Sequence, residues 1–246
     1  MVVSSMAGSD SAWALCSNAT MVGRQAADAA FRAVKMVNRE QVAGAIVEVG
    51  VWRGGMSCYM AMANQHSARD IWLYDTFEGL PEPSSKDDQK SKDFFKRINL
   101  PNFTYKEHVS DGKWCKATLG DVRRTMDRTG YDETMLHFVK GKVEETLAPP
   151  QALLPSEIAV LRLDTDWYES TRMELEVLWP LLSLGGWMYL DDYQTWGGAK
   201  RAVDEWLDQN NWTLQARLVG AFPGSTHWFS LRKNLRYNRA RPFLKR

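Results

Sequence analysis

The 246-residue sequence has little cysteine and no long apolar run. Its three cysteines, Cys16, Cys58 and Cys115, form no spaced metal motif and leave one thiol unpaired in any disulfide scheme. We therefore expect reduced thiols and a cytoplasmic protein. No stretch approaches the roughly 20 apolar residues that span a bilayer. The start of the chain lacks a basic segment followed by a long apolar one, which argues against a secretory signal.

An excess of charge of one sign is also absent. The formal net charge is +1, with 25% charged and 44% hydrophobic residues, as in an ordinary globular protein. Bulk charge therefore gives no reason to expect nucleic acid as a partner. Basic residues do cluster in a C-terminal tail, 232–246, which holds seven of them and no acidic residue. We expect this tail to be a solvated chain end.

Short apolar runs alternate with segments of helical periodicity along most of the chain. This alternation predicts βαβ units, and hence an α/β fold with a doubly wound, mostly parallel sheet. Two runs near the end, 214–220 and 226–233, have no helical segment between them and predict an antiparallel edge. The predicted strands are 45–51, 71–75, 135–141, 158–164 and 186–192. The predicted helices are 24–42, 54–65, 119–130, 168–182 and 198–210.

One α/β domain, 1–246, accounts for the chain, with two segments outside the alternation. Residues 1–44 form an N-terminal helical segment whose apolar side chains could pack on a second copy of the chain. Residues 81–117 are polar and contain Pro81, Pro83 and Pro101. Segments of this length without regular structure are usually functional or disordered. The segment is therefore either a lid that shapes an acceptor pocket or a flexible insertion.

Acidic residues end the first two predicted strands, at the edge of the sheet where ligands bind in such folds. Glu48 and Gly50 precede a turn with Gly54 and Gly55, and a glycine there lets backbone approach a bound cofactor. The spacing differs from the G-x-G-x-x-G of dinucleotide folds. Asp75 ends the next strand, where a carboxylate can accept the hydroxyls of a ribose. Together the turn and the acid favour an adenosine-type ligand.

More aspartates follow the predicted strands 158–164 and 186–192. Asp191 and Asp192 are adjacent and repel one another, so each needs a partner. Either Arg162 pairs with one of them, or a cation is shared with Asp164. Carboxylates without a nearby cysteine or histidine suit a hard ion such as Mg²⁺ rather than zinc. Asp166 stands two residues after Asp164, so an extended segment would place both side chains on the same side.

With these motifs, the sequence resembles the macrocin O-methyltransferase family. Its members are S-adenosylmethionine- and Mg²⁺-dependent enzymes that methylate sugar hydroxyls, of the mycinose- and noviose-modifying type. The matching stretches run in family order from about Val47 to Trp206: VEVGVWRGG, YDTFEGLPEP, FVKGKVEETL, VLRLDTDWYEST and LSLGGWMYLDDYQTWGGAKRAVDEW. The resemblance implies a class I methyltransferase fold of Rossmann-like type.

The resemblance also implies roles for particular residues. Asp164, Asp191 and Asp192 match the metal ligands, for Mg²⁺ or another hard divalent cation, and Asp166 matches the general base. It implies a sugar-containing acceptor, either a glycoside or a glycan. The implied contacts to S-adenosylmethionine come from the first two strand ends: Glu48, Gly50, Val51, Ser57, Asp75 and Thr76.

The chemistry of sugar methylation agrees with these roles. A sugar hydroxyl is a very weak acid, so a divalent ion that chelates two adjacent hydroxyls polarises the acceptor diol. A free carboxylate then removes the proton. Two alternatives stay open: a catechol-type phenolic O-methyltransferase, which needs a base less, and a non-catalytic module that binds an adenosine ligand. Asp166→Asn separates sugar from phenol, and cofactor binding without turnover would indicate the module.

Overall fold

A mostly parallel six-stranded sheet forms the centre of the computed structural model, which describes residues 3–150, 152–210 and 229–233. The strand order is β5-β2-β1-β6-β7-β8, and only β8 runs antiparallel to its neighbour among the strands of this sheet in the described ranges. The strands are β1 (Ala45–Val49), β2 (Ile71–Asp75), β5 (Leu136–Lys140), β6 (Ile158–Leu163), β7 (Leu182–Leu190) and β8 (Phe229–Arg232). The predicted α/β class with an antiparallel edge is therefore confirmed. Of the two runs predicted there, 214–220 lies outside the described residues, as does most of the tail 232–246.

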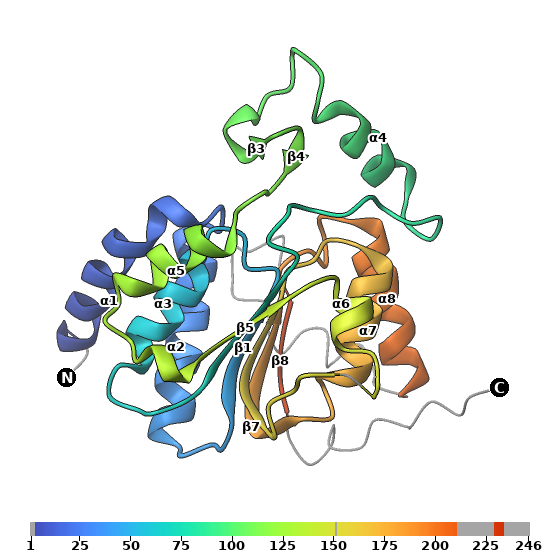
Figure 1. Ribbon diagram of the computed structural model, residues 1–246. Coiled ribbons are helices and arrows are strands. Elements are labelled where there is room, and N and C mark those ends of the chain that lie inside the picture. The colour runs from blue at the N-terminus through green and yellow to red at the C-terminus, as the bar shows by residue number, and fades with distance from the viewer. Residues whose placement is uncertain (1–2, 151, 211–228, 234–246) are drawn as a thin grey trace.

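Helices cover both faces of this sheet, giving three layers (Figure 1). Every residue of β1 and β6 is buried, as expected for central parallel strands with helices on both sides. One face carries α1 (Val3–Cys16), α2 (Arg24–Arg39), α3 (Gly55–Asn64) and α5 (Leu119–Asp127), with the turns η1 (Ser17–Ala19) and η3 (Glu133–Met135) in their connections. The other face carries α6 (Val143–Thr146), α7 (Tyr168–Val177) and α8 (Gly197–Gln209). No helix in the described ranges is long and apolar enough to cross a membrane.

The apolar residues whose helical spacing predicted α2 form the buried face of that helix. Ala27, Ala30, Phe31, Val34 and Val37 are buried in the cluster between the helices and the sheet. Burial of a valine or phenylalanine side chain stabilises a fold by about 1.5–3 kcal/mol. This face therefore holds the N-terminal segment against the sheet of its own chain.

The glycine pair Gly185–Gly186 lies elsewhere than expected. We predicted a helix to residue 182 and glycines that mark its end, but α7 ends at Val177 and both glycines lie inside β7. The pairing of β7 with β6 shifts register between Ile158 and Val160, opposite these glycines. The prediction was wrong because the apolar residues that extended the helical pattern are buried in the turn and in the first residue of the strand instead.

The polar segment 81–117, which we call the lid, is folded. It contains α4 (Gln89–Arg97), the turn η2 (Lys106–His108) and a hairpin of β3 (Val109–Ser110) and β4 (Lys113–Trp114). Figure 1 shows it above the carboxyl ends of the parallel strands. Ile98, Phe103 and Trp114 form a small buried cluster of its own, with Phe94 packed against it. The segment therefore has regular structure and a small apolar cluster, and its role toward an acceptor stays a prediction.

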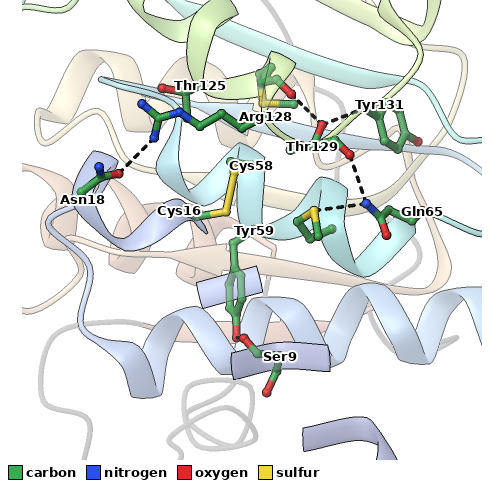
Figure 2. Close-up of a disulfide and its surroundings, with 12 residues drawn as sticks. Ser9, Cys16, Asn18, Cys58, Tyr59, Gln65, Thr125, Arg128, Thr129 and Tyr131 are labelled. Atoms are coloured by element: carbon green, nitrogen blue, oxygen red, sulfur yellow. Dashed lines mark hydrogen bonds between the residues drawn. A yellow bond between two sulfur atoms is a disulfide. The ribbon is translucent and has the colours of Figure 1, made fainter. Parts of the chain in front are cut away.

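A disulfide joins the N-terminal helix to the sheet-covering helix α3 (Figure 2). Cys16 ends α1, Cys58 lies in α3, both are fully buried, and their Cα atoms are 5.9 Å apart. The prediction of reduced thiols was wrong for this pair, and the cytoplasmic expectation loses that support. Cys115 is the unpaired cysteine. The sequence separation of 42 residues gave no sign that α1 packs directly on α3.

Candidate functional site

The carboxyl ends of five parallel strands, β1, β2, β5, β6 and β7, open into a cavity of about 480 Å³ beneath the lid. A volume of this size is typical of small-molecule sites. The strand ladders continue into the loops that line it. The N–H of Asp164 donates to Val49 (2.9 Å) and the N–H of Asp191 donates to Leu163 (3.0 Å). These bonds fix where the acidic residues leave the sheet, which is why the sequence pattern could locate them.

Glu48 is a buried carboxylate whose partners all come from the protein. One oxygen lies 2.7 Å from the guanidinium of Arg162, and the other accepts the hydroxyl of Ser57. Burial raises the pKa of Glu48 to about 7, and the Arg162 charge and the Ser57 hydroxyl oppose that rise. Glu48 thus links β1, α3 and β6 at the base of the cavity.

Gly50 and Asp75 join the first two strand ends to the rest of the site. Gly50 has φ +82°, and a Cβ there would lie 1.9 Å from the carbonyl oxygen of Asp164. We expected this glycine to admit a cofactor, but in the structure it admits the neighbouring loop. Asp75 accepts the N–H groups of Val51 (2.7 Å), Trp52 (3.0 Å) and Phe77 (2.7 Å). Burial raises the pKa of Asp75, and these three donors oppose that rise.

Most of the predicted cofactor contacts line the cavity. Ser57 is the exception, because it is fully buried behind Glu48 and reaches the cavity only through that carboxylate. Thr76 faces the cavity, and its hydroxyl donates to the carbonyl of Gly79 (2.8 Å). The lining residues among the predicted set are Glu48, Gly50, Val51, Asp75 and Thr76. Whether they contact a cofactor stays a prediction.

Four aspartates, which we call the acid cluster (Asp164, Asp166, Asp191 and Asp192), line the part of the cavity that follows β6 and β7. One carboxylate oxygen from each of Asp164, Asp166 and Asp192 can be chosen so that the three lie within 4.8 Å of one another. The guanidinium of Arg162 lies 2.8 Å from Asp164 and 3.3 Å from Asp191. The ion pair that we weighed as one explanation is therefore present, and within the described ranges no arginine pairs with Asp166 or Asp192.

Burial and mutual repulsion act together on these carboxyl groups. Burial is the largest cause that raises the pKa values of Asp166, Asp191 and Asp192, and repulsion from neighbouring aspartates adds to it. Burial lowers the pKa of Arg162, but the surrounding carboxylates outweigh it and raise that pKa above its usual value. With all four carboxyl groups ionised, the cluster would therefore carry more negative charge than one arginine balances.

The donor set fits a hard divalent cation. Asp192 Oδ2 is buried and has no hydrogen-bond partner among the residues that the structure describes. Oxygen donors alone, in excess of positive charge, are what Mg²⁺ and similar ions require. The predicted ligands were Asp164, Asp191 and Asp192, whereas the geometry groups Asp166 with Asp164 and Asp192. Arg162 lies near both Asp164 and Asp191. The division of roles between Asp191 and Asp166 stays a prediction.

Asp166 reaches the cluster through a turn. Its φ is +68°, and the N–H of Trp167 donates to the carbonyl of Thr165 (2.8 Å), which makes Asp166 the centre of a three-residue γ-turn. We expected an extended segment to place Asp164 and Asp166 on the same side. That reasoning was wrong about the backbone, since left-handed φ at Asp166 brings its carboxylate back toward Asp164.

Sequence reasoning missed Glu174. It lies in α7 and is fully buried. Its Oε1 accepts a hydrogen bond (2.7 Å) from the hydroxyl of Thr165, the residue between Asp164 and Asp166 in the chain. Its Oε2 has no hydrogen-bond partner in the described ranges. Burial raises the pKa of Glu174 to about 8. A glutamate in a helical pattern is normally solvent-exposed, so no signal in the sequence separated it from its neighbours.

Aromatic side chains line another part of the cavity. Trp114, Trp167 and Trp196 all line it, and the rings of Trp167 and Trp196 lie 5.3 Å apart. Trp196 also packs on Phe94 of α4 at 5.1 Å and hydrogen-bonds Asp166 through its side chain. These aromatics thus both pack against the lid and face the cavity.

Comparison with known proteins relates the chain to one enzyme family. The family model described as Macrocin-O-methyltransferase (TylF) matches residues 6–221. The 8-demethyl-8-(2,3-dimethoxy-alpha-L-rhamnosyl)-tetracenomycin-C 4'-O-methyltransferase of Streptomyces olivaceus is 37% identical over 71% of this chain and 62% of that protein. The demethyldecarbamoylnovobiocin O-methyltransferase of Streptomyces niveus is 33% identical over 76% of this chain and 67% of that protein. The chain thus spans less than two thirds of the length of the Streptomyces olivaceus relative.

Solved structures share the fold. The O-methyltransferase NovP superposes with a TM-score of 0.70 at 26% identity, covering 88% of this chain and 82% of that chain. CalS11, a calicheamicin methyltransferase, superposes with a TM-score of 0.59 at 21% identity, covering 92% of this chain and 91% of that chain. The class I methyltransferase fold implied by the sequence resemblance is therefore confirmed.

Proposed function

The chain belongs to the macrocin-O-methyltransferase (TylF) family, and from that premise we propose that it transfers a methyl group from S-adenosylmethionine to a sugar hydroxyl. The acceptor that we propose is a deoxysugar or rhamnose-type residue of a glycoside or glycan. The rhamnosyl group in the name of the Streptomyces olivaceus relative supports this class of acceptor. The observation that carries the proposal is the acid cluster, which lines the same cavity as the strand ends of β1 and β2.

We assign cofactor binding and acceptor binding to two different groups of lining residues. On the side of β1 and β2, Glu48, Gly50, Val51, Asp75 and Thr76 would hold the cofactor, with Ser57 fixing Glu48 from behind. On the other side, Trp167 and Trp196 offer aromatic surface to the apolar face of a sugar ring. Holding the acceptor oxygen in line with the methyl group and sulfur supplies much of the acceleration.

We assign proton removal to Asp166. Its γ-turn aims the carboxylate into the acid cluster, beside Asp192 and Trp196. Such a base takes the proton of the acceptor hydroxyl as the carbon–oxygen bond forms, and contributes about 10²–10⁴-fold to the rate. Asp164, Asp191 and Asp192 would hold a divalent ion, which supplies polarisation of the acceptor diol when bound.

Mass spectrometry of methyl transfer tests the proposal. The protein is incubated with S-adenosylmethionine and a panel of rhamnosides and other deoxysugar glycosides, with Mg²⁺ or with EDTA. We expect one added methyl group with Mg²⁺, loss of product in EDTA, and recovery when Mg²⁺ is returned. Asp166→Asn should lower the rate by about 10²-fold or more.

Two results would contradict it. Cofactor binding without product from any glycoside would indicate a non-catalytic module. Turnover of a catechol that Asp166→Asn barely changes would indicate a phenolic acceptor, whose lower pKa makes a base less necessary. Asp127→Asn is the matched control, because this exposed aspartate at the end of α5 lies outside the cavity.

A further inference from the structure

We propose that Asp87 and Asp88 are positioning residues that fasten the lid to the two loops that carry the acid cluster. Neither residue lines the cavity, so both would act from outside it. The proposal rests on the proposed function for its effect on the acceptor, but the contacts themselves are independent of any ligand. We call the pair the clasp.

Asp87 connects the lid to the beginning of α7. It is 4% exposed, and its Oδ1 accepts the N–H of Tyr168, the first residue of α7, at 2.8 Å. Its Oδ2 accepts the N–H of Ser84 within the lid at 2.7 Å. A carboxylate at a helix N-terminus also interacts favourably with the helix dipole. Tyr168 follows Asp166 by two residues, so this bond holds the end of the γ-turn that presents Asp166.

Asp88 makes the equivalent connection to α8. Its Oδ2 accepts the N–H of Gly197, the first residue of α8, at 3.2 Å. Its Oδ1 caps the lid helix α4 by accepting the backbone N–H of Ser91 (2.8 Å) and the Ser91 hydroxyl (2.6 Å). Gly197 is preceded by Trp196, which hydrogen-bonds Asp166. Two adjacent lid residues thus reach the helices that follow both acid-bearing loops.

The start of α8 has a glycine, Gly198, where the Asp87 carboxylate approaches. A Cβ at Gly198 would lie 1.9 Å from Asp87 Oδ1 and 3.1 Å from the backbone nitrogen of Tyr168. A side chain at this position would therefore displace the carboxylate from the helix terminus. The WGG motif that carried part of the family resemblance has a physical role here, because it leaves room for a lid carboxylate.

Further contacts follow the same two loops. The indole of Trp167 donates to the carbonyl of Pro81 (2.8 Å), and Lys90 donates to the carbonyl of Thr195 (2.8 Å). Lys86 pairs with Glu169 at 3.1 Å. The bonds of Lys90 and Lys86 are exposed to solvent, so they stabilise the contact between the lid and the loops less than the bonds of buried Asp87 do. The clasp is the buried part of a polar seam between the lid and the acid-bearing loops.

The consequence concerns acceptor binding more than cofactor binding. With the clasp intact, the lid aromatic Phe94 stays against Trp196, and Trp196 stays against Asp166. Without it, the lid and the two loops can move separately, so an acceptor must order them as it binds. The contacts of β1 and β2 that face the cofactor side do not involve the clasp.

The test breaks the clasp from each side separately. Asp87→Ala removes the acceptor of the Tyr168 N–H, and Gly198→Ala displaces the same carboxylate without changing any charge. Asp93→Ala is the matched control, because Asp93 lies on α4 and its carboxylate accepts a hydrogen bond from exposed Gln89 on the same helix. Far-UV circular dichroism and the affinity for S-adenosylhomocysteine establish that each variant is folded.

Three measurements are then made on each protein. We expect Asp87→Ala and Gly198→Ala to raise the acceptor KM by about tenfold, the effect of losing one hydrogen bond to a charged group, with kcat changed less. We expect the affinity for S-adenosylhomocysteine to stay within about twofold of wild type. We also expect trypsin to cleave the lid about tenfold faster at its basic residues, which include Lys90, Lys92 and Arg97.

An unchanged cleavage rate in both clasp variants would overturn the proposal, as would a loss of cofactor affinity equal to the loss of acceptor affinity. The same holds if Asp93→Ala reproduces their effects. If wild type methylates no glycoside, the proposed function fails, and lid cleavage together with S-adenosylhomocysteine binding still decides whether the clasp fastens the lid.

Discussion

Carboxylates that follow two pairs of neighbouring strands line one cavity, and they differ in what balances their charge. On the side of β1 and β2, Glu48 is paired with Arg162 and Ser57, and Asp75 accepts three backbone N–H groups. On the side of β6 and β7, Asp192 has an oxygen without a hydrogen-bond partner in the described ranges, and it faces Asp166.

This difference separates carboxylates that support the fold from carboxylates that are available for catalysis. A carboxylate whose hydrogen bonds come from the protein itself holds the chain around it in place. A carboxylate left among like charges stays costly until a cation or a proton arrives. Substitutions on the two sides should therefore have opposite effects on stability, and only one side should respond to metal.

The largest expected effect is on catalysis by the unsatisfied side. We expect Asp192→Asn to lower kcat/KM for the acceptor by about 10³-fold, because both charge for the cation and a donor oxygen are lost. Affinity for S-adenosylhomocysteine, measured by calorimetry, should change little. A variant that retains more than about a tenth of wild-type activity would remove Asp192 from the metal site.

The next effect is on folding, and it has opposite signs on the two sides. Glu48→Ala leaves Arg162 without one of its buried partners, so we expect the free energy of unfolding in urea to fall by about 3 kcal/mol. Asp192→Asn removes a repelled charge and should raise the unfolding midpoint in EDTA. Glu133→Ala, at an exposed glutamate, is the control. Equal losses at Glu48 and Asp192 would erase the distinction.

Addition of Mg²⁺ should stabilise the wild-type protein by mass action, by about 2.7 kcal/mol at 100 times the dissociation constant. Differential scanning fluorimetry with and without Mg²⁺ measures this. We expect Asp191→Asn to abolish the shift and Asp166→Asn to keep it while abolishing turnover. The reverse pattern would exchange the roles of these two aspartates, making Asp166 the ligand.

The smallest effect is a change of pH dependence at Glu174. Its pKa is about 8 in the folded protein, against 4.5 for an ordinary glutamate. Between these values the folded protein holds a proton that the unfolded chain has released. Its contribution to stability is therefore complete below about pH 4.5 and is lost as the pH rises to about 8. In Glu174→Gln this loss disappears, so the midpoint in EDTA should fall less between pH 5 and 9, by roughly 2–4 °C. Slopes identical to wild type would contradict the burial of an uncompensated carboxyl group.

The sequence located strands and acids because both depend on local pattern. Runs such as 158–163 are apolar on both faces, and the carboxyl ends of parallel strands gather at one edge, so Asp75, Asp164 and Asp191 had to lie near one another. The order of residues in the chain is enough for this step.

Such local patterns could not predict contacts between segments that are distant in the sequence. The bond between Cys16 and Cys58 depends on how α1 packs on α3, and the clasp depends on lid residues that meet α7 and α8 more than 80 positions later in the chain. The lid looked structureless because its apolar residues are few and widely spaced. Glu174 was missed because helical spacing does not predict that Thr165 folds back and hydrogen-bonds this residue of α7.

The disulfide gives the molecule a covalent ring. Residues 16–58 form a closed loop that contains α2, β1 and the turn at Gly50. The wall of the cavity that includes Ala19–Val22 belongs to the same ring. A protease cut anywhere between residues 17 and 57 would therefore leave two fragments joined, and a gel would separate them only after reduction. The first strand of the sheet and the turn beside the acid cluster thus stay connected to the rest of the chain from both ends.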